Sequence, residues 1–181
     1  SPRLVGNGFD LDTYHFQSAG GGPLGWAGRV APEKGLEDAA AVAAALGEPL
    51  WVWGVREDLA YAEQVEASVP ADTIHWRGFL ATDALQAELG RCRALLNTPK
   101  WNEAYGNVVV EALACGVPVV AYARGGPAEL VQHGLTGFLV APDDVAALRE
   151  ATVQAAGLNR QACRHWVEAH ASQAVFAERV E

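Results

Sequence analysis

The sequence contains no methionine and has few basic side chains for its length. Its 181 residues include 13 lysines and arginines against 22 aspartates and glutamates, which gives a formal net charge of -9 at pH 7. Proteins that bind nucleic acid through their overall field need a basic surface to neutralise the phosphates. The charge balance therefore argues against nucleic-acid binding, and any anion that this chain binds must be held by a local site.

Cysteine is scarce as well. The three cysteines, Cys92, Cys115 and Cys163, are an odd number and include no Cys-x-x-Cys pair. A disulfide framework and a zinc site are therefore both disfavoured. We expect reduced, buried thiols in a cytoplasmic protein.

Long apolar runs are also missing. The longest, near residues 112–123, is interrupted by Gly116 and Pro118, so we expect no membrane span. No secretory signal peptide is recognisable at the start of the chain. Because the chain begins at Ser1 and contains no methionine, we expect it to be a fragment of a longer protein.

What the sequence does contain is a regular alternation of short apolar runs and helical patterns. Residues 1–23 are rich in Gly, Asn, Asp and Ser, which is typical of an irregular interdomain linker. The domain proper is expected over residues 24–181. Its expected strands are residues 24–28, 49–54, 73–78, 93–98, 117–122 and 137–140. Its expected helices are residues 35–47, 57–68, 83–90, a stretch after Gly106, 127–134, 143–156, 159–170 and a third C-terminal helix to the end of the chain.

This order of elements predicts the fold. Short, wholly apolar strands that alternate with helices indicate a parallel sheet with both faces covered. We therefore predict a Rossmann-like, three-layer α/β domain with a parallel sheet of about six strands. Ligands of such sheets bind beyond the carboxyl ends of the strands.

The first candidate site is GWAGRVAPEKG, residues 25–35. Gly28 ends the first expected strand, and Arg29 and Lys34 flank a short Ala-Pro turn before the next helix. Free N–H groups and the helix dipole favour anions at a helix N-terminus, and two cations beside it would complete a phosphate site. The alternative is that both cations are solvated loop residues.

The second candidate site is WNEAYGNVVVEALACG, residues 101–116. Glu111 stands alone in an otherwise apolar helical run, where an unpaired acid is costly. Gly106 allows close approach to the backbone, and residues 106–108 would present N–H groups at the helix start. This arrangement suits a phosphate or a sugar, with Glu103 on the preceding loop.

The spacing of Glu103 and Glu111 suits two contacts with one extended ligand. Glu111 lies about five residues inside the helix, roughly 7 Å further along its axis at 1.5 Å per residue. Two carboxylates at that separation would accept hydrogen bonds from hydroxyl groups at two points of the ligand. Alternatives without function remain: Glu103 as a partner of the helix dipole, and Glu111 in an exposed stripe or a buried ion pair.

These two stretches, together with NGFD (7–10), ACGVPVVA (114–121) and GGPAELVQHGLTGFLV (125–140), resemble the C-terminal half of a retaining GT-B glycosyltransferase. The resemblance is to the large family that includes sucrose synthase and bacterial lipopolysaccharide glucosyltransferases. The chain departs from many relatives at Pro99-Lys100-Trp101-Asn102, where they have Pro-Ser. This departure leaves the identity of the donor sugar open.

The resemblance assigns roles to individual residues. Arg29 and Lys34 would hold the donor diphosphate, and with Glu103, which would orient the sugar, they are the expected catalytic residues. Glu111 would bind the two ribose hydroxyls. The residues expected beside the base are Gly54, Phe79 and Leu80. The rest of the expected donor-binding set is Gly28, Tyr105, Gly106, Asn107 and Val108.

The resemblance also implies an activity. The chain would be the donor-binding half of an enzyme that transfers glucose or another hexose from a nucleoside diphosphate sugar, most often a UDP-sugar, with retention. An N-terminal acceptor domain would be absent from this chain, so the isolated domain is expected to be inactive. The family implies no cofactor and no metal. Asp10-Leu11-Asp12 follows no strand, which argues against a metal site there.

Two other classes of protein stay open. A non-catalytic sensor or assembly domain could keep the same nucleotide-sugar pocket. A plain dinucleotide-binding domain is disfavoured, because the first strand is followed by GRVAPEKG (28–35) and not by Gly-x-Gly-x-x-Gly.

Overall fold

The backbone of a computed structural model is described for residues 11–103 and 107–180, and the side chains up to residue 170. The described residues form a six-stranded sheet in the order β3-β2-β1-β4-β5-β6, in which all neighbouring strands are parallel. The strands are β1 (Leu24–Ala27), β2 (Leu50–Trp53), β3 (Ile74–Gly78), β4 (Ala94–Asn97), β5 (Val119–Tyr122) and β6 (Gly137–Val140). Each lies within its expected range, and the predicted Rossmann-like α/β fold is confirmed.

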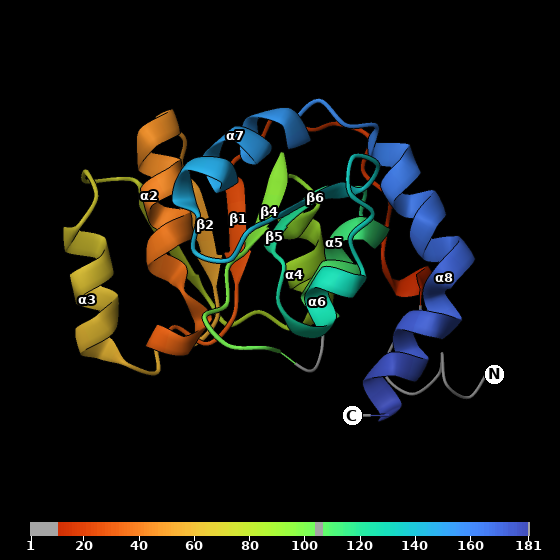
Figure 1. Cartoon of the computed structure of the whole chain (residues 1–181), viewed down its shortest axis with the longest axis horizontal. Coiled ribbons are helices and arrows are strands. Elements are labelled where there is room, and N and C mark those ends of the chain that lie inside the picture. Colours follow the sequence, from red (N-terminus) through yellow and green to blue (C-terminus); the bar gives the residue numbers. More distant parts are fainter. Residues whose placement is uncertain (1–10, 104–106, 181) are drawn as a thin grey trace.

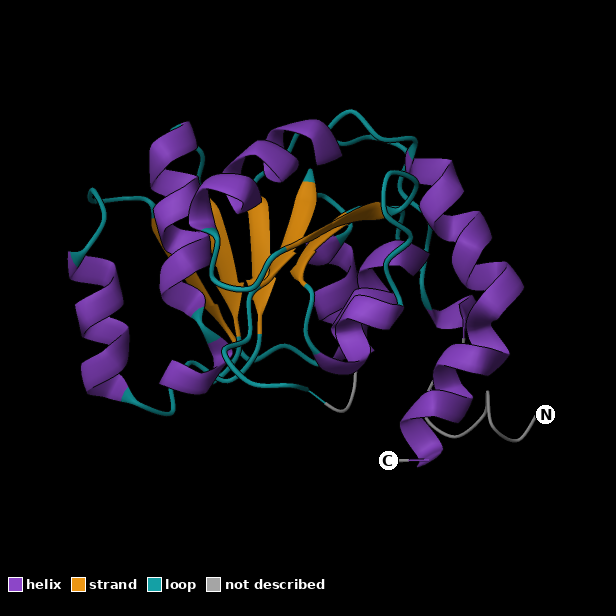
Figure 2. Cartoon of the chain, in the orientation of Figure 1, coloured by secondary structure: helices purple, strands orange, loops and turns teal. Residues whose placement is uncertain are grey.

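Helices cover both faces of this sheet (Figure 1). The helices are α2 (Leu36–Leu46), α3 (Leu59–Ala67), α4 (Thr82–Leu89), α5 (Asn107–Ala114), α6 (Gly125–Glu129), α7 (Val145–Ala155) and α8 (Arg160–Val180), with short 3-10 turns η1 (Leu11–Thr13) and η2 (Pro32–Lys34). Helices α2, α3 and α7 share one apolar core with the sheet, whereas α4, α5 and α8 share the other. Figure 2 shows the strands between these helical layers.

The central strand β4 shows why the two cores form. Ala94 and Leu96 belong to the core beneath α2 and α7, whereas Leu95 belongs to the core beneath α5 and α8. Successive side chains of a strand point to opposite faces, so a strand that is apolar at every position must be covered on both. The continuous apolar strands of the sequence therefore require three layers.

The strand order places a crevice at the middle of the sheet. From β1 the chain proceeds to one side through β2 and β3, and β4 then returns to the other side of β1. The loops that follow β1 and β4 leave the sheet in opposite directions, which opens a binding crevice between them. The two candidate stretches of the sequence follow these two strands.

Two helix boundaries differ from the prediction. Residues 160–180 form the single helix α8 instead of two helices, because this stretch contains no glycine or proline to interrupt it. Helix α6 begins at Gly125 and ends at Glu129, although a helix over residues 127–134 was expected. A turn follows α6, in which Thr136 Oγ1 accepts a hydrogen bond from the Gln132 N–H at 2.9 Å.

The three cysteines are free and buried, as the composition predicted. Burial raises the pKa of Cys92, Cys115 and Cys163 to about 12, so the thiols stay protonated at neutral pH. Among the described residues, no helix combines the length and the apolar character that a membrane crossing requires.

Residues 14–17 precede the sheet in the sequence and are held against α8 by two of its arginines. Arg160 Nε donates to the Gln17 carbonyl at 3.0 Å, and Arg164 Nη1 donates to the Tyr14 carbonyl at 2.7 Å. The Gln17 N–H in turn donates to the Cys115 carbonyl at 3.0 Å. The described end of the expected linker is therefore packed against α5 and α8.

The loops after β1 and β2 approach each other at Gly28 and Gly54. Gly54 has a φ of +133°, and a Cβ placed there would lie 1.9 Å from the Gly28 carbonyl oxygen. Neither the conformation nor the contact tolerates a side chain. Gly54 therefore allows the carboxyl ends of the two strands to lie side by side.

We expect Gly54→Ala to lower the free energy of unfolding by about 2–4 kcal/mol, because the new methyl group must displace a backbone carbonyl. Gly47→Ala is the matched control. Gly47 also has a positive φ, +67°, but its added Cβ would meet no described atom within 4 Å. Its cost should be only about 1 kcal/mol. Urea denaturation of both variants measures the difference, and equal costs would contradict the close approach.

Candidate functional site

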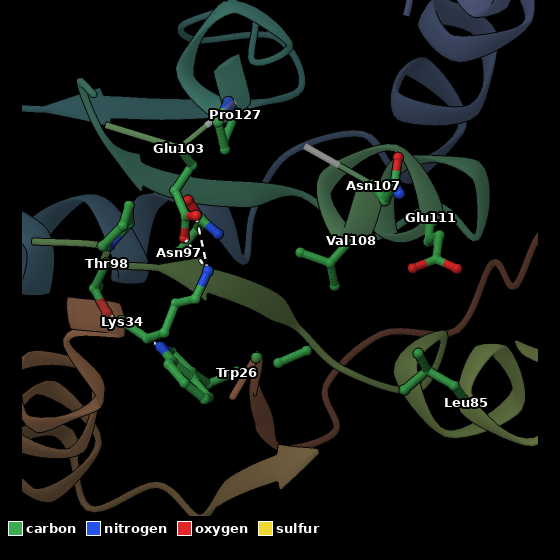
Figure 3. Close-up of a pocket in the computed structure, with 13 residues that line it drawn as sticks. Trp26, Lys34, Leu85, Asn97, Thr98, Glu103, Asn107, Val108, Glu111 and Pro127 are labelled. Carbon is green, nitrogen blue, oxygen red and sulfur yellow. Dashed lines mark hydrogen bonds and ion pairs between the residues drawn. The ribbon is translucent and has the colours of Figure 1, made fainter. Parts of the chain in front are cut away.

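A cavity of about 450 Å³ opens at the carboxyl ends of β1 and β4, against the start of α5. Figure 3 shows the side chains that line it. Its described lining residues are Trp26, Ala27, Gly28, Lys34, Leu85, Asn97, Thr98, Pro99, Glu103, Asn107, Val108, Glu111 and Pro127. Six of these were predicted from the sequence: Gly28, Lys34, Glu103, Asn107, Val108 and Glu111. The cavity therefore joins both candidate stretches.

An ion pair between Lys34 and Glu103 crosses one end of the cavity (Figure 3). Lys34 Nζ lies 2.8 Å from Glu103 Oε1 and 2.7 Å from Oε2. The two side chains are only 21% and 26% exposed, so solvent screens the pair less than it would a surface pair. The positive charge of Lys34 is balanced by Glu103.

The backbone around Gly35 places Lys34 in this position. Gly35 has a φ of +70°, and a Cβ there would lie 2.0 Å from the Thr98 carbonyl oxygen. The Thr98 hydroxyl donates to the Gly35 carbonyl at 2.8 Å and accepts from Trp26 Nε1 at 3.1 Å. The turn that carries Lys34 is therefore packed directly on the loop that leads to Glu103.

The loop that carries Glu103 is held at several points of its backbone. The Lys100 N–H donates to the Glu33 carbonyl at 2.9 Å, and the Gly126 N–H donates to the Glu103 carbonyl at 2.7 Å. Arg124 Nη1 donates to the Pro99 carbonyl at 2.7 Å. These contacts hold the described part of the loop by its backbone.

The side chain of Lys100 fixes the same loop by charge. Its Nζ lies 2.7 Å from Asp38 Oδ2 and 3.1 Å from Asp143 Oδ1. The Tyr122 hydroxyl donates to Asp38 at 2.5 Å. Arg124 and Lys100 together lower the pKa of Asp143 to about 2. The sequence identified Lys100 only as a departure from Pro-Ser, and the structure shows that it connects its own loop to α2 and to the loop before α7.

Glu111 lies in the second turn of α5 and faces the cavity, while Val109, Val110 and Ala112 beside it are buried. The Tyr14 hydroxyl donates to its Oε2 at 2.8 Å. Of the alternatives for this residue, a solvent-exposed stripe is excluded, because Glu111 is only partly exposed and lines a cavity. Figure 3 shows Glu111 well separated from the Lys34–Glu103 pair.

Four of the described site predictions lie outside the cavity lining. Arg29 is exposed and pairs with Glu57 at 2.8 Å and Glu33 at 3.3 Å. Phe79 is 75% exposed, and Leu80 packs on the core shared by α4, α5 and α8. The fourth is Gly54, which contacts Gly28. Two further predicted residues, Tyr105 and Gly106, lie outside the described residues.

Asn97 is a cavity residue that the sequence analysis missed. It is the last residue of β4, and its Oδ1 is buried with no hydrogen-bond partner among the described residues. A buried amide oxygen without a partner is costly. Its position at the carboxyl end of a central strand was the signal that could have identified it. The other lining residues that were missed are Trp26, Ala27, Leu85, Thr98, Pro99 and Pro127.

The geometry suits a ligand with an anionic part and hydroxyl groups. Lys34 can leave Glu103 and pair with a phosphate instead, since ammonium groups bind phosphates readily. Glu103 and Glu111 are hydrogen-bond acceptors when ionised and can accept from hydroxyl donors. The cavity therefore offers a cation and an acceptor at one end and a second acceptor, Glu111, apart from them.

Comparisons with known proteins show which family the chain is similar to. The family model for glycosyl transferases group 1 matches residues 22–157. A 2-deoxystreptamine N-acetyl-D-glucosaminyltransferase from Streptomyces fradiae is 38% identical over 141 residues, which cover 74% of this chain and 33% of that protein. The chain thus spans about a third of this relative's length.

Two solved structures share the fold over most of the chain. AviGT4, a glycosyltransferase involved in avilamycin A biosynthesis, superposes with a TM-score of 0.80 at 28% identity, covering 94% of this chain and 53% of AviGT4. Anabaena HepE in complex with UDP-glucose gives a TM-score of 0.73 at 25% identity, covering 96% of this chain and 54% of HepE. Because the family model matches more than half of its residues, the chain belongs to the group 1 glycosyl transferases, and its fold is that of one half of a GT-B glycosyltransferase.

Proposed function

We propose that this chain is the donor-binding part of a retaining glycosyltransferase, which transfers a hexose from a nucleoside diphosphate sugar to an acceptor. The observation that carries the proposal is the single cavity that joins the Lys34–Glu103 pair to Glu111. A nucleotide sugar has its diphosphate between a sugar and a ribose. The cavity offers a cation and one carboxylate in contact at one end, and a second carboxylate, Glu111, apart from them.

The diphosphate would displace Glu103 from Lys34. Lys34 would then neutralise the charge that grows on the departing diphosphate. Stabilising the charge that develops in the transition state is usually the largest single contribution to catalysis. The N–H groups at the start of α5, where Asn107 and Val108 line the cavity, add to this effect. Arg29, on the turn between Gly28 and Lys34, is proposed as a second diphosphate ligand that leaves Glu57 when the donor binds.

The two carboxylates would hold the ends of the donor. Glu103, released from Lys34, accepts hydrogen bonds from sugar hydroxyls and orients the ring. Glu111 accepts from the ribose hydroxyls, and hydrogen bonds to a charged group contribute about 1.5–3 kcal/mol each. Gly54, Phe79 and Leu80 are proposed to lie beside the base.

The nucleotide is proposed to be UDP and the protein to act in the cytoplasm. The complex of Anabaena HepE with UDP-glucose supports the choice of nucleotide. The acceptor is proposed to bind to a second, N-terminal domain, since this chain spans 33% of its Streptomyces fradiae relative and about half of the two solved chains. Alone, the chain should bind donor and transfer little sugar.

Calorimetric titration of the chain with UDP, ADP, GDP and NADH tests the proposed ligand class. We expect at least one nucleoside diphosphate to bind, with UDP the tightest, because the cavity holds a diphosphate and a ribose together. NADH should not bind. Binding of NADH without binding of any nucleoside diphosphate would reject the proposal in favour of a dinucleotide-binding domain.

Glu111→Ala should weaken UDP binding by about tenfold or more, because the ribose loses a charged acceptor. Inorganic pyrophosphate has no ribose, so its binding should change little. The control is Glu150→Ala, which removes an exposed acid from α7. An equal loss of affinity for UDP and pyrophosphate would contradict the ribose role of Glu111.

Glu103→Gln should tighten pyrophosphate binding by about fivefold or more, because Lys34 no longer has to leave a negative partner, and one such charge at 4 Å is worth about 1 kcal/mol even in bulk water. Glu48→Gln is the matched control. Glu48 pairs with Arg93 at 3.0 Å, and both side chains are 28% exposed, but neither lines the cavity. Titration with pyrophosphate measures both variants. Unchanged or weaker binding by Glu103→Gln would show that the ion pair does not compete with the anion.

A further inference from the structure

Tyr14 connects the segment before the sheet to the nucleotide end of the cavity. Its hydroxyl donates to Glu111 Oε2 at 2.8 Å, although the two residues are 97 positions apart in the sequence. Tyr14 is 5% exposed and belongs to the core shared by α5 and α8. The carboxylate of Glu111 thus meets the cavity while a buried phenol contacts one of its oxygens.

The backbone of Tyr14 is held from both sides. Its N–H donates to the Leu11 carbonyl at 3.1 Å. Its carbonyl accepts from Arg164 Nη1 at 2.7 Å, and the same nitrogen donates to the Ala114 carbonyl at 3.0 Å. Ala114 is the last residue of α5, the helix that carries Glu111. Arg164 of α8 therefore fixes the phenol and the helix relative to each other.

This framework holds the Glu111 carboxylate on one of its oxygens. A glutamate at a cavity wall has three rotatable bonds, and a ligand that binds it must first order it. A fixed O–H donor on Oε2 orders the carboxylate in advance, and supporting hydrogen bonds of this kind keep a binding group in its productive geometry. This ordering should increase the affinity only for ligands that carry the group that Glu111 contacts.

We propose that Tyr14 is a positioning residue for the nucleoside part of the donor, because it holds the Glu111 carboxylate in place for the ribose 2′- and 3′-hydroxyls. The inference rests on the proposed function, and it adds a residue from the segment before the sheet to the nucleotide site. If Tyr14 has this role, nucleotide affinity also depends on how that segment packs against α8.

A purely structural role makes a different prediction. If the hydroxyl of Tyr14 served only to satisfy buried polar groups, its loss would lower the stability of the whole domain and affect all ligands of the cavity alike. A positioning role affects only ligands that carry ribose hydroxyls. The two roles therefore separate when ligands with and without these hydroxyls are compared.

The experiment compares Tyr14→Phe with the unmodified chain by calorimetric titration with UDP, 2′,3′-dideoxyuridine diphosphate and inorganic pyrophosphate. The variant keeps the ring and its packing and removes only the O–H donor. We expect UDP binding to weaken by about three- to tenfold, the range for one net hydrogen bond. Binding of the dideoxy nucleotide and of pyrophosphate should be unchanged. Unchanged UDP binding, or an equal loss for all three ligands, would overturn the inference.

Tyr61→Phe is the matched control. Tyr61 is also part-buried, and its hydroxyl donates to a glutamate, Glu37, on the opposite face of the sheet. Burial, with Glu37 beside it, raises the pKa of Tyr61, as burial and Glu111 do for Tyr14. The control removes a similar Tyr–Glu bond that lies outside the cavity lining, so it should leave UDP binding unchanged. Weaker UDP binding by this control would mean that the affinity reports general stability, which would overturn the inference.

A double-mutant cycle tests whether Tyr14 acts through Glu111. In a Glu111→Ala background, Tyr14→Phe should cause no further loss of UDP affinity, because the group that it positions is gone. A loss in that background as large as in the unmodified chain would show that Tyr14 acts by another route.

A measurement on the unmodified chain covers the case in which Tyr14→Phe does not fold. With ¹³C-labelled tyrosine, the ring Cζ resonance of Tyr14 should shift when UDP binds and stay in place when pyrophosphate binds. The same shift with both ligands, or none with UDP, would reject the inference. Failure of the proposed function looks different, because the unmodified chain would then bind no nucleoside diphosphate at all.

Discussion

The ion pair between Lys34 and Glu103 is the interaction around which the site is built. The two residues are 69 positions apart and lie on turns that follow different strands, β1 and β4. Their carboxyl ends are neighbours only because the strand order reverses between them. A partly buried ammonium group needs a counter-charge, and Glu103 supplies it. Any anion that binds must offer Lys34 a better partner, so the pair selects for ligands of high negative charge.

The described parts of the loops that carry this pair are held by contacts outside the cavity. Lys100, Asp38 and Asp143 form a charged cluster behind the Glu103 loop, with the Tyr122 hydroxyl donating to Asp38. Two backbone hydrogen bonds, from the Gly126 N–H to the Glu103 carbonyl and from the Lys100 N–H to the Glu33 carbonyl, hold the same loop at two points. A binding group that is already in place costs a ligand less ordering entropy than a flexible one. The site therefore combines a held framework with the ion pair that we propose the ligand exchanges.

Much of the fold could be predicted because local pattern and global structure agree. Every strand was predicted within its range, since short, mostly apolar runs that alternate with helical patterns have few other uses in such a domain. The predictions that failed were helix ends. Residues 160–180 form one helix although two were expected, and α6 is shorter than expected because Thr136 closes a turn after it. Helix ends depend on caps and on tertiary neighbours, which periodicity does not report.

The sequence by itself determined the α/β class, the strands, and the two stretches that carry Lys34, Glu103 and Glu111, because residue type and local spacing are sufficient for these. Only the tertiary structure decided which polar groups meet. It turned Arg29 toward Glu57 and away from the cavity lining, and it placed Tyr14 against Glu111 across 97 positions. It also placed the buried Asn97 oxygen in the cavity wall. Such pairings depend on strand order and helix packing, and no local pattern encodes the distance between residues that chain folding brings together.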